Sequence, residues 1–382
     1  MPRNLSILLC IILFIGTGCY GRTEVNDTVV AMGRGLDIEG ENCVYSAQLA
    51  LPKPREGSLT GPQYIVATEK ASGFAEAARR LFLFLPRQPI WAMANTIVLG
   101  EKMVRQGPEI YMDFLMRNRN THPNSFLFVA IGASPEEILK TAVPTENYSA
   151  LGLEKIIQRQ ENSIGIYIPV TGVIFANRMS TEGIEPFVPQ IRLMKGEDQE
   201  KLILDGTAIF REGRMVGSLN EQESRGLRFL QTGMISGGLF AVDEPGNSNT
   251  GNQITLELIR SQSTIKPSLD GNRIKMQIQV EAEGNYYEQN SSDNIFSIEN
   301  VPAIEAQANQ AIKHYIMACI TKCQELESDV LGWGTLINFK YPKEWETLKA
   351  SWPQYFSRME FEVSVNYKLR RGYLLDGSFK FN

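Results

Sequence analysis

The stretch "RIKMQIQVEAEG", residues 273–284, alternates apolar and polar side chains. In a β-strand Ile274, Met276, Ile278 and Val280 would share one face, because successive side chains point to opposite sides. The lysine and glutamines between them would face water. Alternation with one wet face is typical of an antiparallel sheet. The stretch therefore predicts a strand in a sheet that is covered on one side only.

Two further segments alternate in the same way, "ITLELI" (254–259) and "MEFEVSVNYKLR" (359–370). Between them, residues 301–328 carry apolar side chains at helical spacing, which predicts a long helix with one apolar stripe. The apolar stripe of this helix is suited to cover the apolar face of the sheet. Polar, turn-rich residues at 243–252 and 284–294 indicate exposed loops. This part of the chain is therefore predicted to be α+β, with helices packed on one face of an antiparallel sheet.

The segment before it reads as a hairpin followed by a helix. "EKLILDGTAIFREGRMVGSLN" (200–220) predicts two strands around the turn "REGR", and Asn220 is the expected cap of a helix over 220–230. Upstream, "NYSALGLEKIIQRQ" (147–160) indicates a helix. The two prolines of "EPFVPQIRLM" (185–194) favour a sheet edge, because proline cannot donate to a ladder.

The first part of the chain alternates strand-like and helix-like segments, which indicates a mixed α/β region. In it, "SPEEILKT" (134–141) has the signature of a capped helix start. We expect a multidomain α+β protein with about three domains, because the chain has 382 residues. The expected division is a signal peptide, an N-terminal mixed α/β domain, a middle domain and a C-terminal α+β domain, at residues 1–18, 19–143, 144–233 and 234–382.

The N-terminus has the three-part form of a secretory signal: Arg3, an apolar run from Leu5 to Gly16, and small residues. The run is shorter than the about 20 residues that a membrane-spanning helix needs. Cys19 follows directly, at the position where bacterial lipoproteins are acylated. Two or three acyl chains would hold the cleaved protein at a membrane. The alternatives are a cysteine that happens to follow a signal, or an uncleaved helix of marginal length.

The composition limits the kinds of partner and functional site that we expect. A net charge of −5 gives no electrostatic reason to expect nucleic acid as a partner. The two histidines, His122 and His314, are too few for a histidine-rich metal site. Cys319 and Cys323 share the apolar stripe of the long helix, so packing explains them better than redox chemistry. No combination of residues supplies a nucleophile, a base and an orienting group, so no catalytic residue, metal ligand or cofactor site is predicted.

Three stretches together resemble the Ger(x)C family, the lipoprotein C subunits of spore germinant receptors. They are "GCYGRTEVNDTVVAMGRGLDI" (18–38), "GTAIFREGRMVGSLNEQESRGLRFL" (206–230) and "GWGTLINFKYPKEWETLKASWPQYF" (332–356). The last is the most specific, with Tyr-Pro-Lys-x-Trp and a second tryptophan seven residues on. Its aromatic residues also have a structural explanation as a local core. Residues 144–199 match the family weakly.

The resemblance implies a non-enzymatic subunit, held by lipid on Cys19 at the outer face of the spore's inner membrane. Its implied partners are an integral membrane A subunit and a transporter-like B subunit. In the family, nutrient recognition is attributed chiefly to the B subunit. Glu223, Ser224, Arg225 and Gly226 would either cap and pair a helix or contact another subunit. The sequence leaves both readings open.

Two other classes of protein stay open as alternatives. An extracytoplasmic solute-binding lipoprotein would capture a nutrient directly, in a concave site lined by convergent polar groups. An exported enzyme, such as a cell-wall hydrolase, would depend on an essential carboxylate, and no residue of the sequence is nominated for that role.

Overall fold

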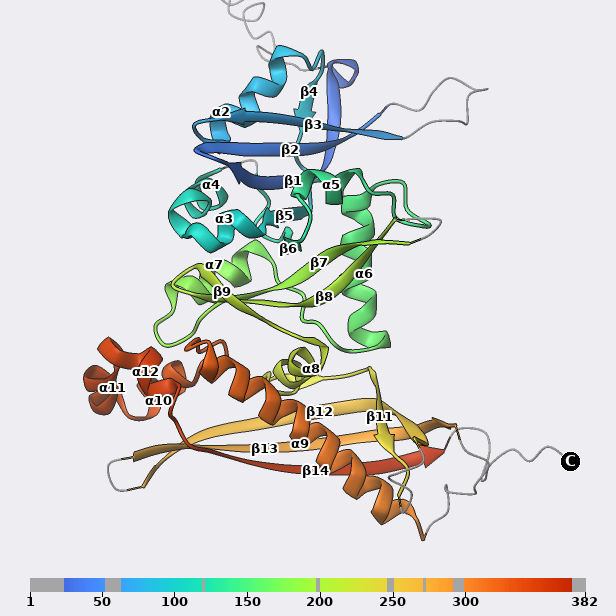
Figure 1. The fold of residues 1–382 in the computed structure, drawn as a ribbon, viewed down its shortest axis with the longest axis vertical. Helices are drawn as coiled ribbons and strands as arrows, with labels where there is room; N and C mark the ends of the chain where they lie inside the picture. Colours follow the sequence, from blue (N-terminus) through green and yellow to red (C-terminus); the bar gives the residue numbers. More distant parts are fainter. Residues whose placement is uncertain are drawn as a thin grey trace, which may run out of the picture.

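The described chain forms two sheets that lie one above the other along the long axis of the molecule, with helix α8 (Glu221–Phe229) between them (Figure 1). The structure is a computed structural model. It describes residues 24–51, 63–118, 121–196, 200–245, 251–270, 273–290 and 299–372. Cys19 and the expected signal segment lie outside the described residues.

The first sheet has nine strands in the order β3-β2-β1-β5-β6-β7-β8-β9, with β4 beside β1. Its central strands β1, β5, β6 and β7 pair in parallel, and antiparallel strands flank them on both sides. Every residue of β5 is buried, as expected for a parallel strand covered on both faces. The strands are β1 (Thr28–Glu39), β2 (Asn42–Ala50), β3 (Tyr64–Ala71), β4 (Gln88–Ile90), β5 (Thr96–Gly100), β6 (Phe126–Ile131), β7 (Phe187–Lys195), β8 (Glu200–Arg211) and β9 (Arg214–Leu219).

Helices cover both faces of this sheet, so it separates two cores. Val98 and Phe128 pack with α5 and α6 on one face, whereas their neighbours Ile97 and Leu127 belong to the core on the other face, with α2, α3 and α7. Adjacent residues enter different cores because strand side chains alternate. The helices are α2 (Phe74–Arg80), α3 (Glu101–Gln106), α4 (Met112–Arg117), α5 (Pro135–Lys140), α6 (Ser149–Ser163) and α7 (Gly172–Ser180), with the 3₁₀ turns η1 (Val25–Asp27), η2 (Leu81–Leu83) and η3 (Pro108–Ile110).

The large sheet runs across the boundary expected near residue 143. β6 pairs in parallel with β7, with Val129 opposite Gln190, and β8 and β9 continue the same sheet to Leu219. Residues 144–219 therefore share a sheet and both cores with the residues before them. The expected middle domain does not have a sheet of its own.

β7 is an interior strand, so the prediction of a sheet edge at its prolines is wrong. Pro189 lies opposite Thr207 of β8, but the pairing with β6 begins only at Gln190. The β7–β8 register also shifts between Pro189 and Ile191. A bulge and the start of the parallel pairing let the sheet accept a residue without an N–H donor.

The second sheet has five strands, β10 (Met234–Ile235), β11 (Leu239–Asp243), β12 (Gln253–Asp270), β13 (Arg273–Gln289) and β14 (Phe361–Gly372). β10, β11 and β13 pair antiparallel with β12 as expected, but β14 pairs with β13 in parallel. The chain between β13 and β14 passes through several helices, and a crossover of that kind permits parallel pairing. These helices are α9 (Val301–Glu325), α10 (Trp333–Lys340), α11 (Pro342–Leu348) and α12 (Trp352–Phe356), with the turn η4 (Lys349–Ser351).

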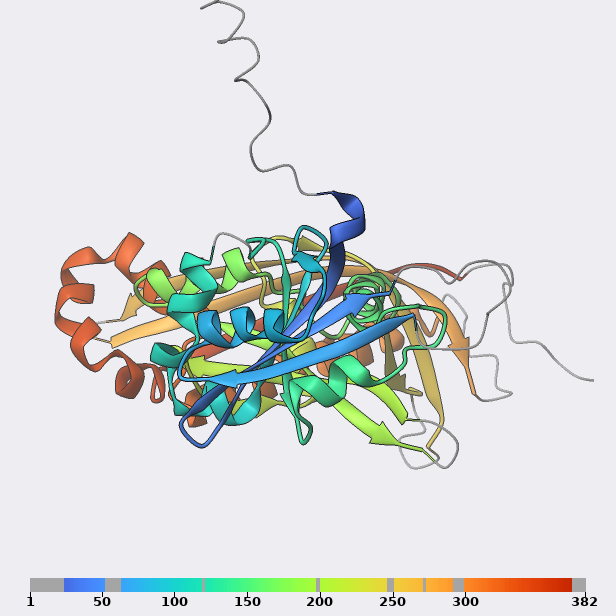
Figure 2. The ribbon, with the colours of Figure 1, turned by 90° about the horizontal axis from the view of Figure 1, so that it is seen from above.

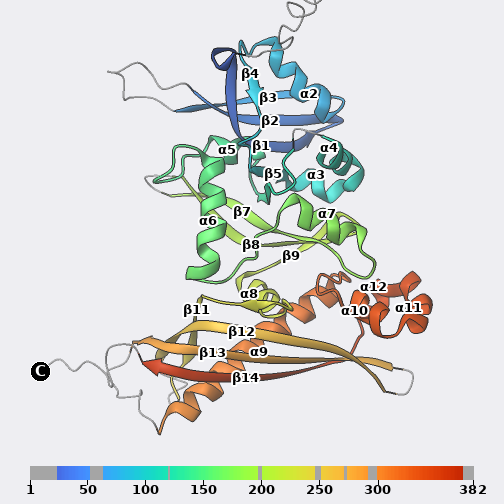
Figure 3. The same cartoon turned by 180° about the vertical axis from the view of Figure 1, so that it is seen from behind.

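The alternating pattern of β13 appears in the structure as predicted. Ile274, Met276 and Val280 are buried, and α9 lies across this side of the sheet (Figure 1). Seen from behind, the strands lie in front of α9 (Figure 3). Gln277 and Gln279 are exposed, and alternation along the strand puts them on the face opposite to Met276 and Val280. The predicted α+β architecture, with helices on one face of the C-terminal sheet, is confirmed.

The aromatic residues after α9 form a local core. The rings of Trp345 and Trp352 meet edge to face with centroids 5.1 Å apart, and Tyr355 stacks on Trp352 at 5.9 Å. Both tryptophans are buried. The structural explanation of this motif is therefore confirmed.

Candidate functional site at the interdomain helix

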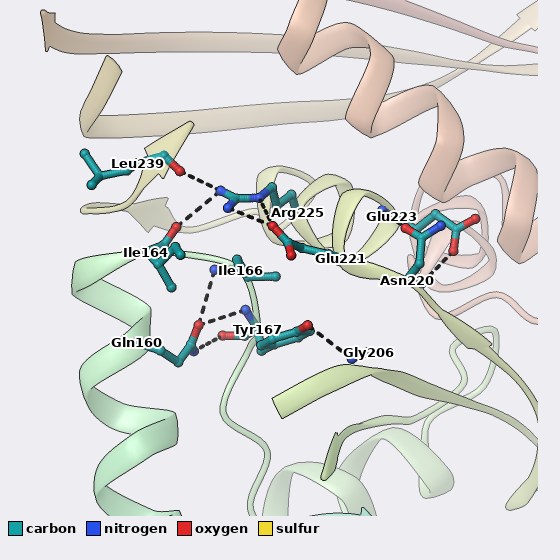
Figure 4. A network of polar contacts seen from close by, with 10 residues as sticks. All are labelled: Gln160, Ile164, Ile166, Tyr167, Gly206, Asn220, Glu221, Glu223, Arg225 and Leu239. Atoms are coloured by element: carbon teal, nitrogen blue, oxygen red, sulfur yellow. Dashed lines mark hydrogen bonds and ion pairs between the residues drawn. The ribbon is translucent and has the colours of Figure 1, made fainter. Parts of the chain in front are cut away.

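Helix α8 carries the Glu-Ser-Arg-Gly segment and lies between the two sheets (Figure 4). A reciprocal cap fixes its start. The Asn220 side chain accepts from the Glu223 backbone N–H at 2.9 Å, and the Glu223 carboxylate accepts from the Asn220 N–H at 2.7 Å. This arrangement satisfies donors that a helix N-terminus otherwise leaves free. The predicted cap at Asn220 is confirmed, and Glu223 is part of it.

Ser224 and Gly226 face other parts of the same chain. The Ser224 hydroxyl is buried and lies 2.9 Å from the hydroxyl of Thr207 in β8. Gly226 lies against α9, where an added Cβ would come within 2.0 Å of the Tyr315 carbonyl oxygen. The glycine is needed because the two helix backbones approach too closely for a side chain. These two residues thus hold α8 between β8 and α9.

Arg225 connects α8 to both sheets. Its guanidinium donates to the carbonyl oxygens of Ile164 at 3.2 Å and Leu239 at 2.7 Å (Figure 4). It also pairs with Glu221 at 3.1 Å, and only 12% of its side chain is exposed. Ile164 follows α6 of the large sheet, whereas Leu239 begins β11 of the second sheet. One planar group with several donors therefore joins backbone from the two halves.

Arg228 makes a second connection of this kind, which the sequence analysis missed. Its guanidinium donates to the carbonyl oxygens of Gly237 at 3.0 Å, Ser236 at 2.7 Å and Glu161 at 3.0 Å. The residue is only 4% exposed. Burial lowers the pKa of Arg228, and the nearby Glu161 opposes this shift. The sequence feature that could have identified Arg228 is its position three residues after Arg225, because this spacing places both arginines on one side of the helix.

The end of α6 is fixed beside this helix by a further network. The Gln160 amide donates to the Tyr167 carbonyl oxygen at 2.6 Å and accepts from the backbone N–H groups of Ile166 at 3.3 Å and Tyr167 at 3.1 Å. The Tyr167 hydroxyl in turn accepts from the Gly206 N–H of β8 at 3.2 Å (Figure 4). The backbone that Arg225 and Arg228 contact is therefore itself held in place.

A second junction lies at the turn between α9 and α10. The buried Asp329 carboxylate accepts from the N–H groups of Gly332 at 2.8 Å, Trp333 at 3.1 Å and Gly334 at 2.8 Å, and from the Trp352 indole at 3.1 Å. Burial raises the pKa of Asp329 to about 6, against the effect of these four donors. The Asp329 carbonyl oxygen also accepts from the Glu185 N–H at 2.8 Å, just before β7. This junction thus ties the C-terminal helices to the large sheet.

The side chains at these two junctions hold parts of the chain together. Their charged groups bind backbone groups of this chain rather than converging on an open site. In the part of the chain that the structure describes, no cluster of histidine, cysteine and acidic side chains is placed to hold a metal ion. Cys319 and Cys323 are buried and free, and burial together with the neighbouring thiol raises the pKa of Cys319. Buried thiols of this kind are poor nucleophiles.

We expect Arg228→Met to lower the free energy of unfolding by about 2–4 kcal/mol, because three carbonyl oxygens lose a charged donor whose own side chain is buried. Urea denaturation of the purified protein measures this change. Arg159→Met removes an exposed arginine from α6 and is expected to change stability by less than about 0.5 kcal/mol. Equal stability of the two variants would contradict a connecting role for Arg228.

The fold and its junctions define a class: a two-sheet α+β protein whose halves are joined by a capped, arginine-bearing helix. Two family models match the chain, "Spore germination protein N-terminal domain" over residues 21–193 and "Spore germination B3/GerAC like, C-terminal" over residues 205–373. The chain belongs to this spore germination family. The second match begins in β8, so both matched regions contribute strands to the large sheet.

Individual relatives agree with this assignment along nearly their whole length. "Putative spore germination protein YfkR" of Bacillus subtilis (strain 168) is 24% identical, and the alignment covers 97% of this chain and 96% of the relative. "Spore germination protein KC" of the same organism is 23% identical, with 98% and 97% covered. The crystal structure of the GerBC protein shares the fold, with a TM-score of 0.57 at 19% identity over 88% of this chain and 96% of that one.

Proposed function

We propose that this protein is the lipid-anchored C subunit of a spore germinant receptor, and that it contributes to nutrient-triggered germination through contacts with an integral membrane A subunit and a transporter-like B subunit. The observation that carries the proposal is the match of both family models, which together span residues 21–193 and 205–373. In this proposal the protein acts through physical contacts with its partner subunits and catalyses no reaction.

The proposed attachment is a thioether-linked lipid on Cys19, at the outer face of the spore's inner membrane. The apolar run before Cys19 supports it, because cleavage of that run makes another anchor necessary. None of the helices in the described ranges is long and apolar enough to cross a membrane.

Contact between the Glu-Ser-Arg-Gly segment and another subunit stays a prediction. Ser224 and Gly226 are buried within this chain, whereas Glu223 and Arg225 keep part of their surface in water. A partner that reached this segment would meet those two side chains. In the proposed assembly, α8 and the Asp329 turn would transmit a displacement of one sheet to the other, because each is hydrogen-bonded to backbone beside the large sheet and to backbone of the C-terminal half.

Cys19→Ala is expected to release the protein from the membrane fraction and to reduce nutrient-triggered germination to the level of a strain that lacks the gene. The reason is that the substitution removes the site of acylation. Membrane fractionation of spores and germination with nutrient mixtures measure the two effects. Cys10→Ala, within the expected signal, is the matched control and should leave both unchanged. Normal germination and membrane retention with alanine at position 19 would refute the anchor.

A cavity in the N-terminal half favours a second candidate function, direct capture of a nutrient. It has a volume of about 600 Å³, and its lining includes Arg34, Arg79 and Arg117, together with Asp113, which pairs with Arg117, and the ring of Trp91. Such a lining suits a small molecule that carries a carboxylate. Calorimetry with candidate amino acids and sugars tests it: stoichiometric binding that Arg117→Gln weakens would support a solute-binding protein.

A further inference from the structure

Large apolar side chains are exposed at the end of the molecule where the described chain begins. Phe82, Leu83 and Phe84 are consecutive and are 50%, 76% and 53% exposed. Val25, Ile90 and Met93 are 84%, 40% and 61% exposed. We call these six residues the apolar pole. A run of exposed apolar residues in a globular protein marks a surface that contacts something other than water.

Strand pairing brings the members of the apolar pole together. β4 lies parallel to the start of β1, with Thr28 opposite Gln88 and Val30 opposite Ile90. The turn that contains Val25 is therefore beside the segment that follows Phe84. The start of β1, the end of α2 and β4 all lie at the top of the molecule in Figure 1, and Figure 2 looks down on this end.

The position of the apolar pole relative to the proposed anchor limits what it can contact. Residues 20–23 separate Cys19 from Glu24, where the described chain begins. Even fully extended, the five steps from Cys19 to Glu24 span at most about 18 Å. If Cys19 is acylated, as proposed above, the apolar pole is therefore held next to the membrane surface.

We propose that the apolar pole inserts into the boundary between headgroups and acyl chains of the bilayer and orients the protein with its long axis pointing away from the membrane. Phenylalanine and leucine side chains bind this region by burial of apolar surface. The charges nearby are mixed: Arg79 and Arg80 are exposed, but so are Glu24, Asp27 and Glu76. Arg80 pairs with Glu69 and Glu76. Binding should therefore depend on apolar contact rather than on anionic lipid.

The test places a tryptophan at the apolar pole and another far from it. Leu83→Trp reports on the pole, and Phe339→Trp is the matched control, because Phe339 is 91% exposed on α10 in the other half of the molecule. The mature chain is coupled through its Cys19 thiol to a maleimide lipid in phosphatidylcholine vesicles whose acyl chains carry bromine. Emission from the native tryptophans is subtracted with the unsubstituted protein.

A side chain inserted about 5–10 Å into the boundary is expected to lose at least about half of its emission to the bromines, whereas the control loses almost none. Equal, weak quenching at both positions would overturn the proposal and would favour a protein partner for the apolar pole. Flotation of the native protein from spore membranes tests the anchor separately. In the vesicle experiment the protein is attached through a maleimide lipid, so insertion of the apolar pole is tested even if Cys19 is not acylated in spores. A failure of acylation and a failure of insertion therefore give different results.

Discussion

Asp329→Ala is expected to lower the free energy of unfolding by about 3–5 kcal/mol, because buried donors left without an acceptor cost about 1–3 kcal/mol each. The substitution leaves three backbone N–H groups and the Trp352 indole without their acceptor in a buried turn. It also removes a negative charge that acts on Arg178, whose pKa burial lowers to about 10 while Asp329 opposes the shift. The turn between α9 and α10 would lose its order and, with it, its contact with the large sheet.

Equilibrium urea denaturation followed by tryptophan fluorescence measures this loss. Asp329→Asn keeps the shape and one acceptor oxygen but turns an amide N–H₂ toward backbone donors, so we expect a smaller loss of about 1–3 kcal/mol. Asp243→Ala, at an exposed position of β11, is the control and should cost less than about 0.5 kcal/mol. A change at Asp329 as small as that at Asp243 would show that the turn does not depend on the carboxylate.

Gly226→Val is expected to destabilise the protein by about 3 kcal/mol or more, at the upper end of overpacking effects. The new Cβ would come within 2.0 Å of the Tyr315 carbonyl oxygen, which belongs to the backbone of α9 and cannot move aside as a flexible side chain can. The two helices would have to separate. Because α8 also carries Arg225 and Arg228, the bonds to Leu239 and Gly237 would be strained as well.

Thermal unfolding and the yield of soluble protein measure the effect of this substitution. Gly233→Val is the matched control, because no atom lies within 4 Å of the position that its Cβ would occupy. We expect the control to fold like the parent protein. If valine at 226 were tolerated as well as valine at 233, the close approach of α8 and α9 would not be a requirement of the fold.

Much of the local structure follows from the sequence. The caps at Ser134 and Asn220 form because an acceptor side chain stands before each helix and a glutamate stands three residues on. The hairpin around Glu212 and Gly213 forms as its turn residues predict, with both at positive φ. The buried face of β13 and the stripe of α9 follow from hydrophobic periodicity. These features depend on neighbours within a few residues.

The connections between distant segments do not follow in this way. Periodicity shows which face of a strand is buried, but it does not show which strand pairs with it. The continuity of the large sheet through β7, and the parallel pairing of β14 with β13, therefore could not be read from the pattern. Likewise, the sequence alone would place Arg225 and Arg228 on the exposed face of a helix. The carbonyl oxygens that they bind belong to the end of α6 and to the segment before β11, which are distant in sequence or lie outside the helix.

The sequence by itself thus determined the α+β class, the helix caps, the buried faces and the likeness to a spore germination family. The tertiary structure alone decided the order and direction of the strands, the joining of the two sheets through α8 and Asp329, and the gathering of apolar residues beside the start of the described chain. The physical reason is range: propensity, capping and alternation act over a few residues, whereas strand partners and buried hydrogen bonds depend on segments brought together only by folding.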